Sequence, residues 1–343
     1  MELTNRGMAI KIMRLIFAMV FLLSVFPPAF SQTPEIPETD RIRLAEAFRL
    51  GEELGDKVWP KWSQAPFGVL LVTAEHEFLV RHLHPTSDFT LIGYDSLLKS
   101  NIYFRKRTQP TSFLATFPAV GGISTIVVGQ AENTQAKTST PWVVTLLHEH
   151  FHQLQESQPN TFADINALNL SRGDQTGMWM LNFPFPYETP EMKQQFTLLA
   201  RALVEALQSK SKTDFSKKLQ TYLRTRADLK QMLNADDYKY MSFQLWKEGT
   251  ARYTEYKIAI EASKRFNPGK EFRALKDFTS FDVVATDVMN GIINELTTLK
   301  IEGYKRVAFY PIGAGEALLL DRVKPKWQQR YFVEKFDLEK YFR

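Results

Sequence analysis

The sequence predicts an α+β protein, in which a sheet comes early in the chain and a mainly helical half follows it. Residues 66–130 contain short apolar and β-branched runs bounded by turn residues, as strands are. From residue 140 onward, the apolar residues recur at helical spacing over long stretches. We therefore expect an N-terminal mixed or antiparallel sheet, a buried helix and a mainly helical C-terminal half, together forming one domain of residues 32–343.

The elements of the first half can be placed from their patterns. A helix is expected over residues 40–58, and residues 67–72 and 77–82 form a hairpin. Residues 125–128 form another apolar strand just before the buried helix. Segment 158–188 is rich in loops, and we interpret its aromatic run, residues 183–187, as loop packing, with a lid or cleft wall as the alternative.

The second half is mainly helical. Thr189, Pro190 and Glu191 supply a cap, a proline and an acidic residue in order, which is how a helix begins. Asn234 can cap another helix, whose first turn carries acidic residues. Further helices are expected over residues 214–233, 235–262 and 280–299.

The segment from His148 to His152, with the pattern H-E-x-x-H, predicts a metal site. Thr140 can cap its helix, and Pro141 suits the first turn. Residues four apart share a helix face, so His148 and His152 can bind one metal ion. Glu149 lies beside that ion, where it can take a proton from an activated water molecule.

A catalytic zinc ion (Zn²⁺) needs a third protein ligand and an open position. Glu156 lies about 12 Å along the helix from His148, which is too far, and His150 points to the opposite side. Glu248 is the best candidate, because it lies on the second long helical pattern. On spacing alone, an ordinary solvated face of acidic and basic residues remains the alternative.

The neighbours of Glu248 suggest how its helix packs. The small residues Gly249 and Ala251 would let this helix closely approach the helix that carries the H-E-x-x-H motif. Arg252 shares a face with Glu248 and Glu255, and it could hold either carboxylate in place.

These residues resemble the gluzincin branch of zinc peptidases, particularly bacterial peptidase MA-like domains. The similarity lies in H-E-x-x-H, in the later W-x-E-G-x-A-x-Y element around Glu248, and in a Y-x-x-G segment that begins at Tyr310. The resemblance implies a zincin-like fold, with His148, His152 and Glu248 as zinc ligands and Glu149 as the base. It also implies that Tyr310 stabilises an oxyanion.

Two further expectations follow from the same resemblance. The strand at residues 125–128 would be an edge strand that pairs with extended substrate. Thermolysin-like enzymes have an aspartate where this chain has Arg252, so the resemblance does not assign the partner of the histidines.

The N-terminus and the composition limit the expected cellular location, the kinds of metal site and the partners of this protein. Residues 1–31 have a basic start, an apolar middle and a small-residue exit, which is typical of a cleaved secretory signal, with an uncleaved membrane anchor as the alternative. The chain has no cysteine, which excludes disulfides and cysteine-rich zinc sites. Its net charge of +5 is mild and dispersed, which argues against a nucleic-acid partner.

The predicted function is that of an exported, periplasmic or extracellular zinc peptidase, without stable membrane insertion after cleavage, acting on peptide or protein substrates. Either Tyr310 or Arg252 would donate to the oxyanion. Two alternatives remain: a non-catalytic exported binding protein on a zincin scaffold, and a zinc amidohydrolase that acts on cell-wall or other non-protein amides. The sequence does not predict the oligomeric state.

Overall fold

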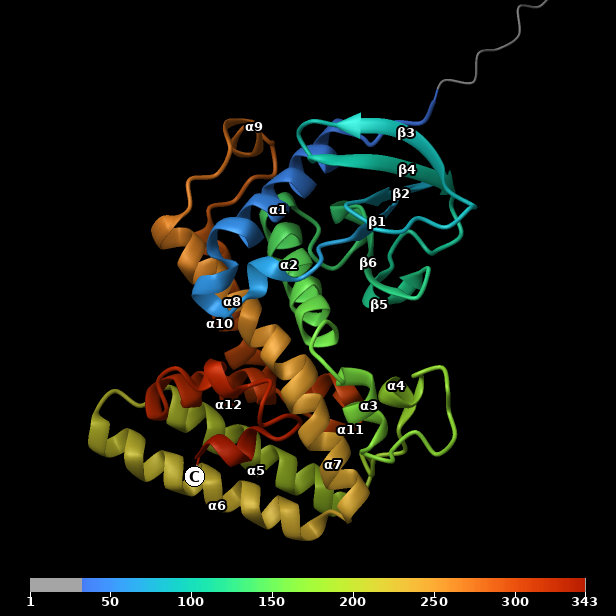
Figure 1. Ribbon diagram of the computed structural model, residues 1–343. Helices are drawn as coiled ribbons and strands as arrows, with labels where there is room; N and C mark the ends of the chain where they lie inside the picture. The colour runs from blue at the N-terminus through green and yellow to red at the C-terminus, as the bar shows by residue number, and fades with distance from the viewer. Residues whose placement is uncertain (1–32, 343) are drawn as a thin grey trace, which may run out of the picture. The chain divides into compact units, whose positions relative to one another are not determined.

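A six-stranded sheet forms the first half of the computed structural model, which describes residues 33–342 (Figure 1). Its strands are, in sequence, β1 (Val69–Val72), β2 (His76–Val80), β3 (Thr90–Asp95), β4 (Ser100–Lys106), β5 (Leu114–Val120) and β6 (Ile123–Gly129). Their order across the sheet is β3-β4-β2-β1-β6-β5. Strands β1 and β6 are parallel, whereas the other neighbouring pairs are antiparallel. The prediction of an α+β protein with a mixed sheet is therefore confirmed.

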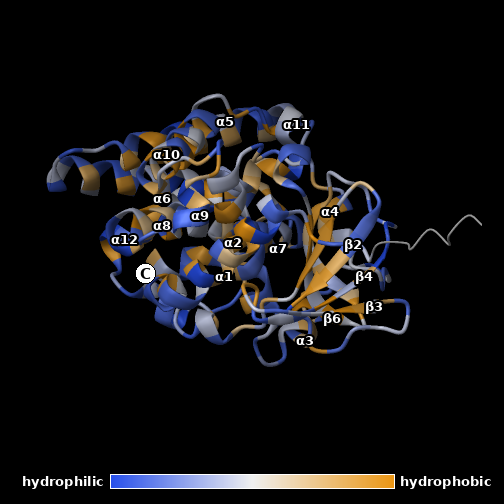
Figure 2. Ribbon diagram, turned by 90° about the horizontal axis from the view of Figure 1, so that it is seen from above, coloured by the Kyte–Doolittle hydropathy of each residue, from blue (hydrophilic) through white to orange (hydrophobic). Residues whose placement is uncertain are grey.

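The predicted hairpin is the β1–β2 pair. Its antiparallel register runs from Val69 opposite Val80 to Val72 opposite Glu77. Strand β1 is apolar at every position and fully buried. One of its faces packs against the main core, and the other lies in a smaller apolar group that includes Phe89. Figure 2 accordingly shows the sheet largely in the hydrophobic colour, whereas most helices alternate between the two colours.

The expectation of an edge strand at residues 125–128 is wrong. These residues lie in β6, which has β1 on one side and β5 on the other. Strand β5 forms this edge of the sheet, and its outer side pairs with no described strand. Strand β6, which precedes the helix of the H-E-x-x-H motif in sequence, therefore lies one position in from the edge. The chain forms the edge strand β5 first and then turns back to form β6 before it enters that helix.

Helices make up most of the rest of the described chain. The longer ones are α1 (Glu38–Val58), α2 (Ser139–Glu156), α5 (Pro190–Leu207), α6 (Lys212–Met232), α7 (Ala235–Gln244), α8 (Thr250–Arg265), α10 (Phe281–Thr297) and α12 (Phe309–Val323). Short helices are α3 (Thr161–Asn166), α4 (Trp179–Asn182), α9 (Lys270–Arg273) and α11 (Ile301–Tyr304). In Figure 1, α2 runs between the sheet and the pair α1 and α8, all of which it contacts.

Helix α2 begins differently from the prediction. It starts at Ser139, and Thr140 is not its cap. The carboxylate of Asp277, far along the chain, accepts hydrogen bonds from Ser139 N at 2.9 Å and from Ser139 Oγ at 2.7 Å. The hydroxyl of Thr140 instead accepts from Thr279 N. A distant carboxylate thus satisfies a free N–H group at this helix start, and such a partner leaves no local sequence signal.

Two predicted helix starts are confirmed. Thr189 accepts a hydrogen bond from Met192 N at the start of α5. Asn234 accepts from the backbone N–H groups of the acidic residues in the first turn of α7. The helix expected over residues 235–262 is also present, but a π-helical segment, η3 (Leu245–Gly249), separates α7 from α8. π-Helical turns often lie at functional sites, and this one carries Glu248.

Gly249 has a different role from the expected one. A Cβ atom there would lie 2.4 Å from the Cα atom of Gly313 in α12. A Cβ atom on Gly313 would lie 2.5 Å from the carbonyl oxygen of Leu245. The small residue at position 249 therefore lets η3 approach α12 rather than α2. The two glycines meet backbone to backbone.

The N-terminal expectations fall partly outside the structure. The predicted signal at residues 1–31 lies outside the described residues. From Pro34 onward the chain forms one compact unit. Within residues 33–342, no helix combines the length and apolar character needed to cross a bilayer.

Candidate metal centre

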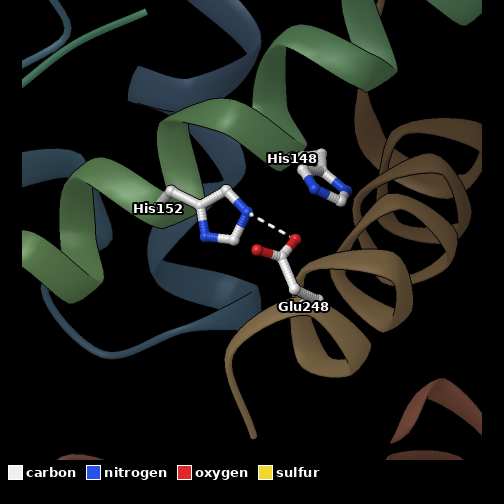
Figure 3. A group of neighbouring side chains, drawn as sticks. All are labelled: His148, His152 and Glu248. Atoms are coloured by element: carbon white, nitrogen blue, oxygen red, sulfur yellow. Dashed lines mark ion pairs between the residues drawn. The ribbon is translucent and has the colours of Figure 1, made fainter. Parts of the chain in front are cut away.

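Helix α2 and the π-helical segment η3 bring His148, His152 and Glu248 together (Figure 3). One ligand atom from each residue lies within 4.8 Å of the others, and His152 Nε2 is 3.3 Å from Glu248 Oε2. The two histidines are almost fully buried, and the side chain of Glu248 is 12 % exposed. The alternative of a solvated face is therefore wrong, and the three residues form a largely buried group that can hold a metal ion.

The imidazole of His148 is oriented from behind by Glu255. Its Nδ1 atom lies 2.7 Å from Glu255 Oε1, which leaves Nε2 as the atom available to a metal. Burial alone would raise the pKa of the Glu255 carboxyl, but Arg252 and His148 lower it below its ordinary value. A carboxylate that accepts from the outer nitrogen of a histidine ligand fixes the ring and increases its basicity.

The guanidinium of Arg252 binds two carboxylates. Its NH1 atom lies 2.5 Å from Glu255 Oε2, and its NH2 atom lies 3.1 Å from Glu295 Oε1. The guanidinium thus binds the carboxylate behind His148, and the expectation that Arg252 donates to the oxyanion stays a prediction. Its other suggested role, holding Glu255 in place, agrees with this geometry.

The imidazole of His152 is held by Gln155. Its Nδ1 atom lies 2.7 Å from Gln155 Oε1, and Lys247 Nζ lies 3.3 Å from the same nitrogen. The amide nitrogen of Gln155 donates to the hydroxyl of Tyr331 at 2.8 Å. These contacts leave Nε2 of His152 facing Glu248. This role of Gln155 was not predicted, although its spacing of three from His152 is a usable signal.

The carboxylate of Glu248 lies among positive charges. Burial alone would raise its pKa, but His152, Lys247 and Arg306 together hold the pKa well below the ordinary value. Lys247 Nζ and Arg306 NH1 each lie 3.8 Å from Glu248 Oε1. Glu248 is therefore ionised, which a carboxylate ligand must be.

Glu149 is fixed beside this group by the edge strand. The hydroxyl of Thr116, in β5, donates to Glu149 Oε2 at 2.7 Å and lies 3.0 Å from the backbone oxygen of Glu149. The carboxylate is not one of the three clustered ligand groups, as the motif predicts. The pKa of His148 is raised despite the opposing effect of burial, and the charge of Glu149 contributes to this after that of Glu255.

Tyr310 lies beside the same group, at the start of α12. Its ring is nearly parallel to that of His148, with the centroids 6.3 Å apart. Arg306 NH1 donates to the Tyr310 hydroxyl at 2.9 Å. Burial, followed by the nearby Glu248 carboxylate, holds the pKa of the phenol well above its usual range, so the hydroxyl keeps its proton. Arg306 was not predicted, because nothing in its local sequence marks it.

Two residues that the sequence excluded as ligands lie elsewhere. The ring of His150 stacks on Phe67, with the centroids 3.7 Å apart, and burial lowers the pKa of this imidazole to about 3. Glu156 is not in the three-residue group, and burial raises the pKa of its carboxyl. Neither residue therefore competes with Glu248 as the third ligand.

The aromatic run at residues 183–187 has two sides. Phe183 and Phe185 are buried in the main core, as loop packing predicts. The same run also lines a cavity together with Arg306, which agrees with the alternative of a cleft wall. The run thus packs against the core and also forms part of a cavity wall.

The chain matches no protein-family model, and it has no significant match among curated proteins or solved structures. What the site can do therefore follows from its own geometry.

Proposed function

We propose that this chain is an exported zinc-dependent peptidase with a zincin-like fold. The observation that carries the proposal is the convergence of His148, His152 and Glu248, with the carboxylate of Glu149 held beside them. Two imidazoles and one carboxylate are a donor set of catalytic zinc sites. Neighbouring ligand atoms of a tetrahedral zinc ion lie about 3.4 Å apart, so modest side-chain rotation would close this group on an ion.

Bound zinc would supply a Lewis acid that activates a water molecule and polarises the substrate carbonyl. Glu149 takes the proton from that water and later delivers it to the leaving amine. Thr116 supports this role, because its hydroxyl fixes one of the two carboxylate oxygens. A purely structural metal site would have no use for such a base.

The developing oxyanion needs a hydrogen-bond donor. Tyr310 suits this role, because its phenol keeps its proton and its ring lies next to that of His148. Arg306 donates to the same hydroxyl and thereby fixes its position. A donor aimed at developing charge in a site shielded from water contributes strongly to catalysis.

The edge strand β5 suits an extended peptide. Phe113 accepts a hydrogen bond from Gly129 N in β6, so by alternation Leu114 and Thr116 direct their backbone groups outward. Pro118 has no N–H group and limits further pairing along the strand. A peptide added to this edge would run past Thr116, whose side chain holds Glu149.

The proposal is tested by metal analysis and by hydrolysis of a panel of peptides and cell-wall fragments, with and without chelator. The protein should hold zinc and cleave peptides, and chelator should abolish the cleavage. Cleavage of cell-wall amides alone would assign a different hydrolase, and bound peptide without turnover would indicate a binding protein. Sequencing the N-terminus of the secreted protein tests export, with cleavage expected after Ser31.

A further inference from the structure

A cavity of about 430 Å³ lies next to the candidate metal centre. One wall is the run of residues 181–189, and Lys305 and Arg306 also line it. Arg306 belongs to both places, because its NH1 atom contacts the Tyr310 hydroxyl and lies 3.8 Å from Glu248 Oε1. The cavity therefore adjoins the three-residue group and shares a side chain with its surroundings.

The aromatic wall is fixed by the core behind it. The rings of Phe183 and Tyr240 stack with their centroids 4.4 Å apart, and Phe185 meets Phe309 edge-on at 5.4 Å. Phe309 is the first residue of α12 and precedes Tyr310. The wall is thus packed against the helix that carries the proposed oxyanion donor, so one set of contacts holds both the cavity and the site.

More positive than negative side chains line the cavity. Lys305 is exposed, and within residues 33–342 no acidic side chain forms an ion pair with it. Glu188 also lines the cavity, but its carboxylate lies 3.5 Å from Lys193 Nζ. The Arg306 guanidinium adds a second positive group, whose carboxylate neighbour Glu248 lies 3.8 Å away. An anionic group in the cavity would therefore meet a cation that has no internal counter-charge.

The backbone at Lys305 is also unusual. Its φ of 48° and ψ of −129° are rarely adopted by a residue with a side chain. Such conformations are strained and persist where the surroundings impose them, often at functional sites. This residue joins α11 to η4 (Lys305–Ala308), the turn that leads into α12. The strained turn places Lys305 at the cavity and Arg306 beside Tyr310.

We propose that this cavity binds a carboxylate of the peptide substrate near the scissile bond, with Lys305 as its counter-charge. The inference rests on the proposed peptidase function and names the substrate class, which is peptides with an acidic side chain or a free C-terminus near the cleaved bond. The carboxylate lies where Lys305 and Arg306 line the cavity. The aromatic and proline wall contacts the apolar part of the same substrate residue.

The test uses one acetylated hexapeptide series with glutamate placed at each position in turn, and the matched glutamine and lysine series. Each peptide is made with a free and an amidated C-terminus, which separates the two sources of carboxylate. Cleavage by the zinc-loaded protein is measured as kcat/KM, and binding to zinc-loaded Glu149→Gln is measured by fluorescence anisotropy. The binding measurement does not depend on turnover.

The expected result is about a fivefold preference for the carboxylate at one position, a size typical of a partly exposed ion pair. Lys305→Gln should remove this preference, and Lys305→Glu should shift it toward lysine-bearing peptides. The control is Lys99→Gln, because Lys99 is also exposed and has a φ of 51°, but lies in the β3–β4 turn. This control should keep the wild-type preference.

The outcomes separate the two proposals. Cleavage without a carboxylate preference, or a preference that survives both Lys305 variants, would overturn the cavity assignment and leave the peptidase in place. A Lys305-dependent preference in binding, without cleavage of any peptide, would support the cavity and reject the peptidase. If no peptide is bound or cleaved, both proposals are wrong.

Discussion

The carboxylate of Glu255 lies 2.7 Å from His148 Nδ1 and follows Glu248 on the same helical stretch. This stretch therefore brings two carboxylates to the histidine pair of α2, one among the ligand groups and one behind His148. Arg252 lies between the two in sequence and holds Glu255 through a charged hydrogen bond. The partner that the resemblance left unassigned is thus a glutamate about one helical turn after Arg252.

Glu255→Gln should weaken zinc binding by about 10- to 100-fold, because the amide is a weaker acceptor for His148 than the carboxylate. Competition with a chelator of known affinity measures the change. Glu261→Gln is the control on the same helix, since Glu261 pairs with Arg265 rather than with a histidine. Equal zinc affinity in the two variants would show that Glu255 does not support the site.

The candidate ligand and base residues of this site could be predicted from the sequence more readily than the side chains that hold them in place. His148, Glu149 and His152 could be found because a helix places residues at fixed spacing on one face. Gln155 and Glu255 act through contacts between side chains, and only Gln155 has a local spacing that indicates its role. The contact of Glu255 depends on how two helices pack, which the pattern of one helix does not specify.

The fold shows the same division between local and distant causes. Caps such as Asn234 were predicted because the donor and acceptor lie within one turn of each other. The start of α2 was not, since its carboxylate comes from Asp277. The order of strands in the sheet depends on pairing between distant parts of the chain. The apolar pattern of residues 125–128, which lie in β6, therefore could not show that β5 rather than β6 forms the edge.

Glu149→Gln should keep zinc but lower kcat by about 100- to 10,000-fold, because glutamine cannot accept the proton that hydrolysis releases. Peptide hydrolysis and metal content are measured on the same sample. Glu156→Gln is the matched control on α2, since its carboxyl lies outside the three-residue group. A Glu149→Gln protein that cleaves peptides at the parent rate would remove Glu149 as the base.

Glu248→Ala should reduce zinc retention and the thermal stabilisation that zinc provides, because one of three ligands is lost. Metal content after dialysis and the change in Tm on adding zinc measure the two effects. The fall in Tm that chelator causes in the wild type should be absent in the variant. Unchanged metal content after dialysis would exclude Glu248 as a ligand.

Gly249→Ala should destabilise the fold by about 1–3 kcal/mol, the usual range for overpacking a buried contact. The added Cβ atom would lie 2.4 Å from the backbone of Gly313, which cannot rotate away as a side chain would. Urea unfolding measures the change in the free energy of unfolding. Gly303→Ala is the control, since a Cβ atom there meets nothing within 4 Å, and a comparable loss in both variants would contradict the close approach of η3 and α12.

In the metal-free protein, His150 should lower the free energy of unfolding by about 2 kcal/mol as the pH drops from 7 to 5. Burial lowers the pKa of this imidazole to about 3 in the folded state, whereas the unfolded chain has an ordinary value near 6.5. Between these two values the unfolded state binds the extra proton. The stability contributed by neutral His150 is therefore complete above about pH 6.5 and is lost as the pH falls toward 3.

His150→Phe isolates this contribution, because phenylalanine can occupy the aromatic position against Phe67 and does not titrate. The free energy of unfolding is measured in urea at pH 7 and at pH 5 for both proteins, with chelator present. The difference between the two pH values should be about 2 kcal/mol smaller in the variant. Comparing differences removes the packing change, which affects both pH values alike, so equal pH dependence in the two proteins would show that His150 is not the buried neutral group.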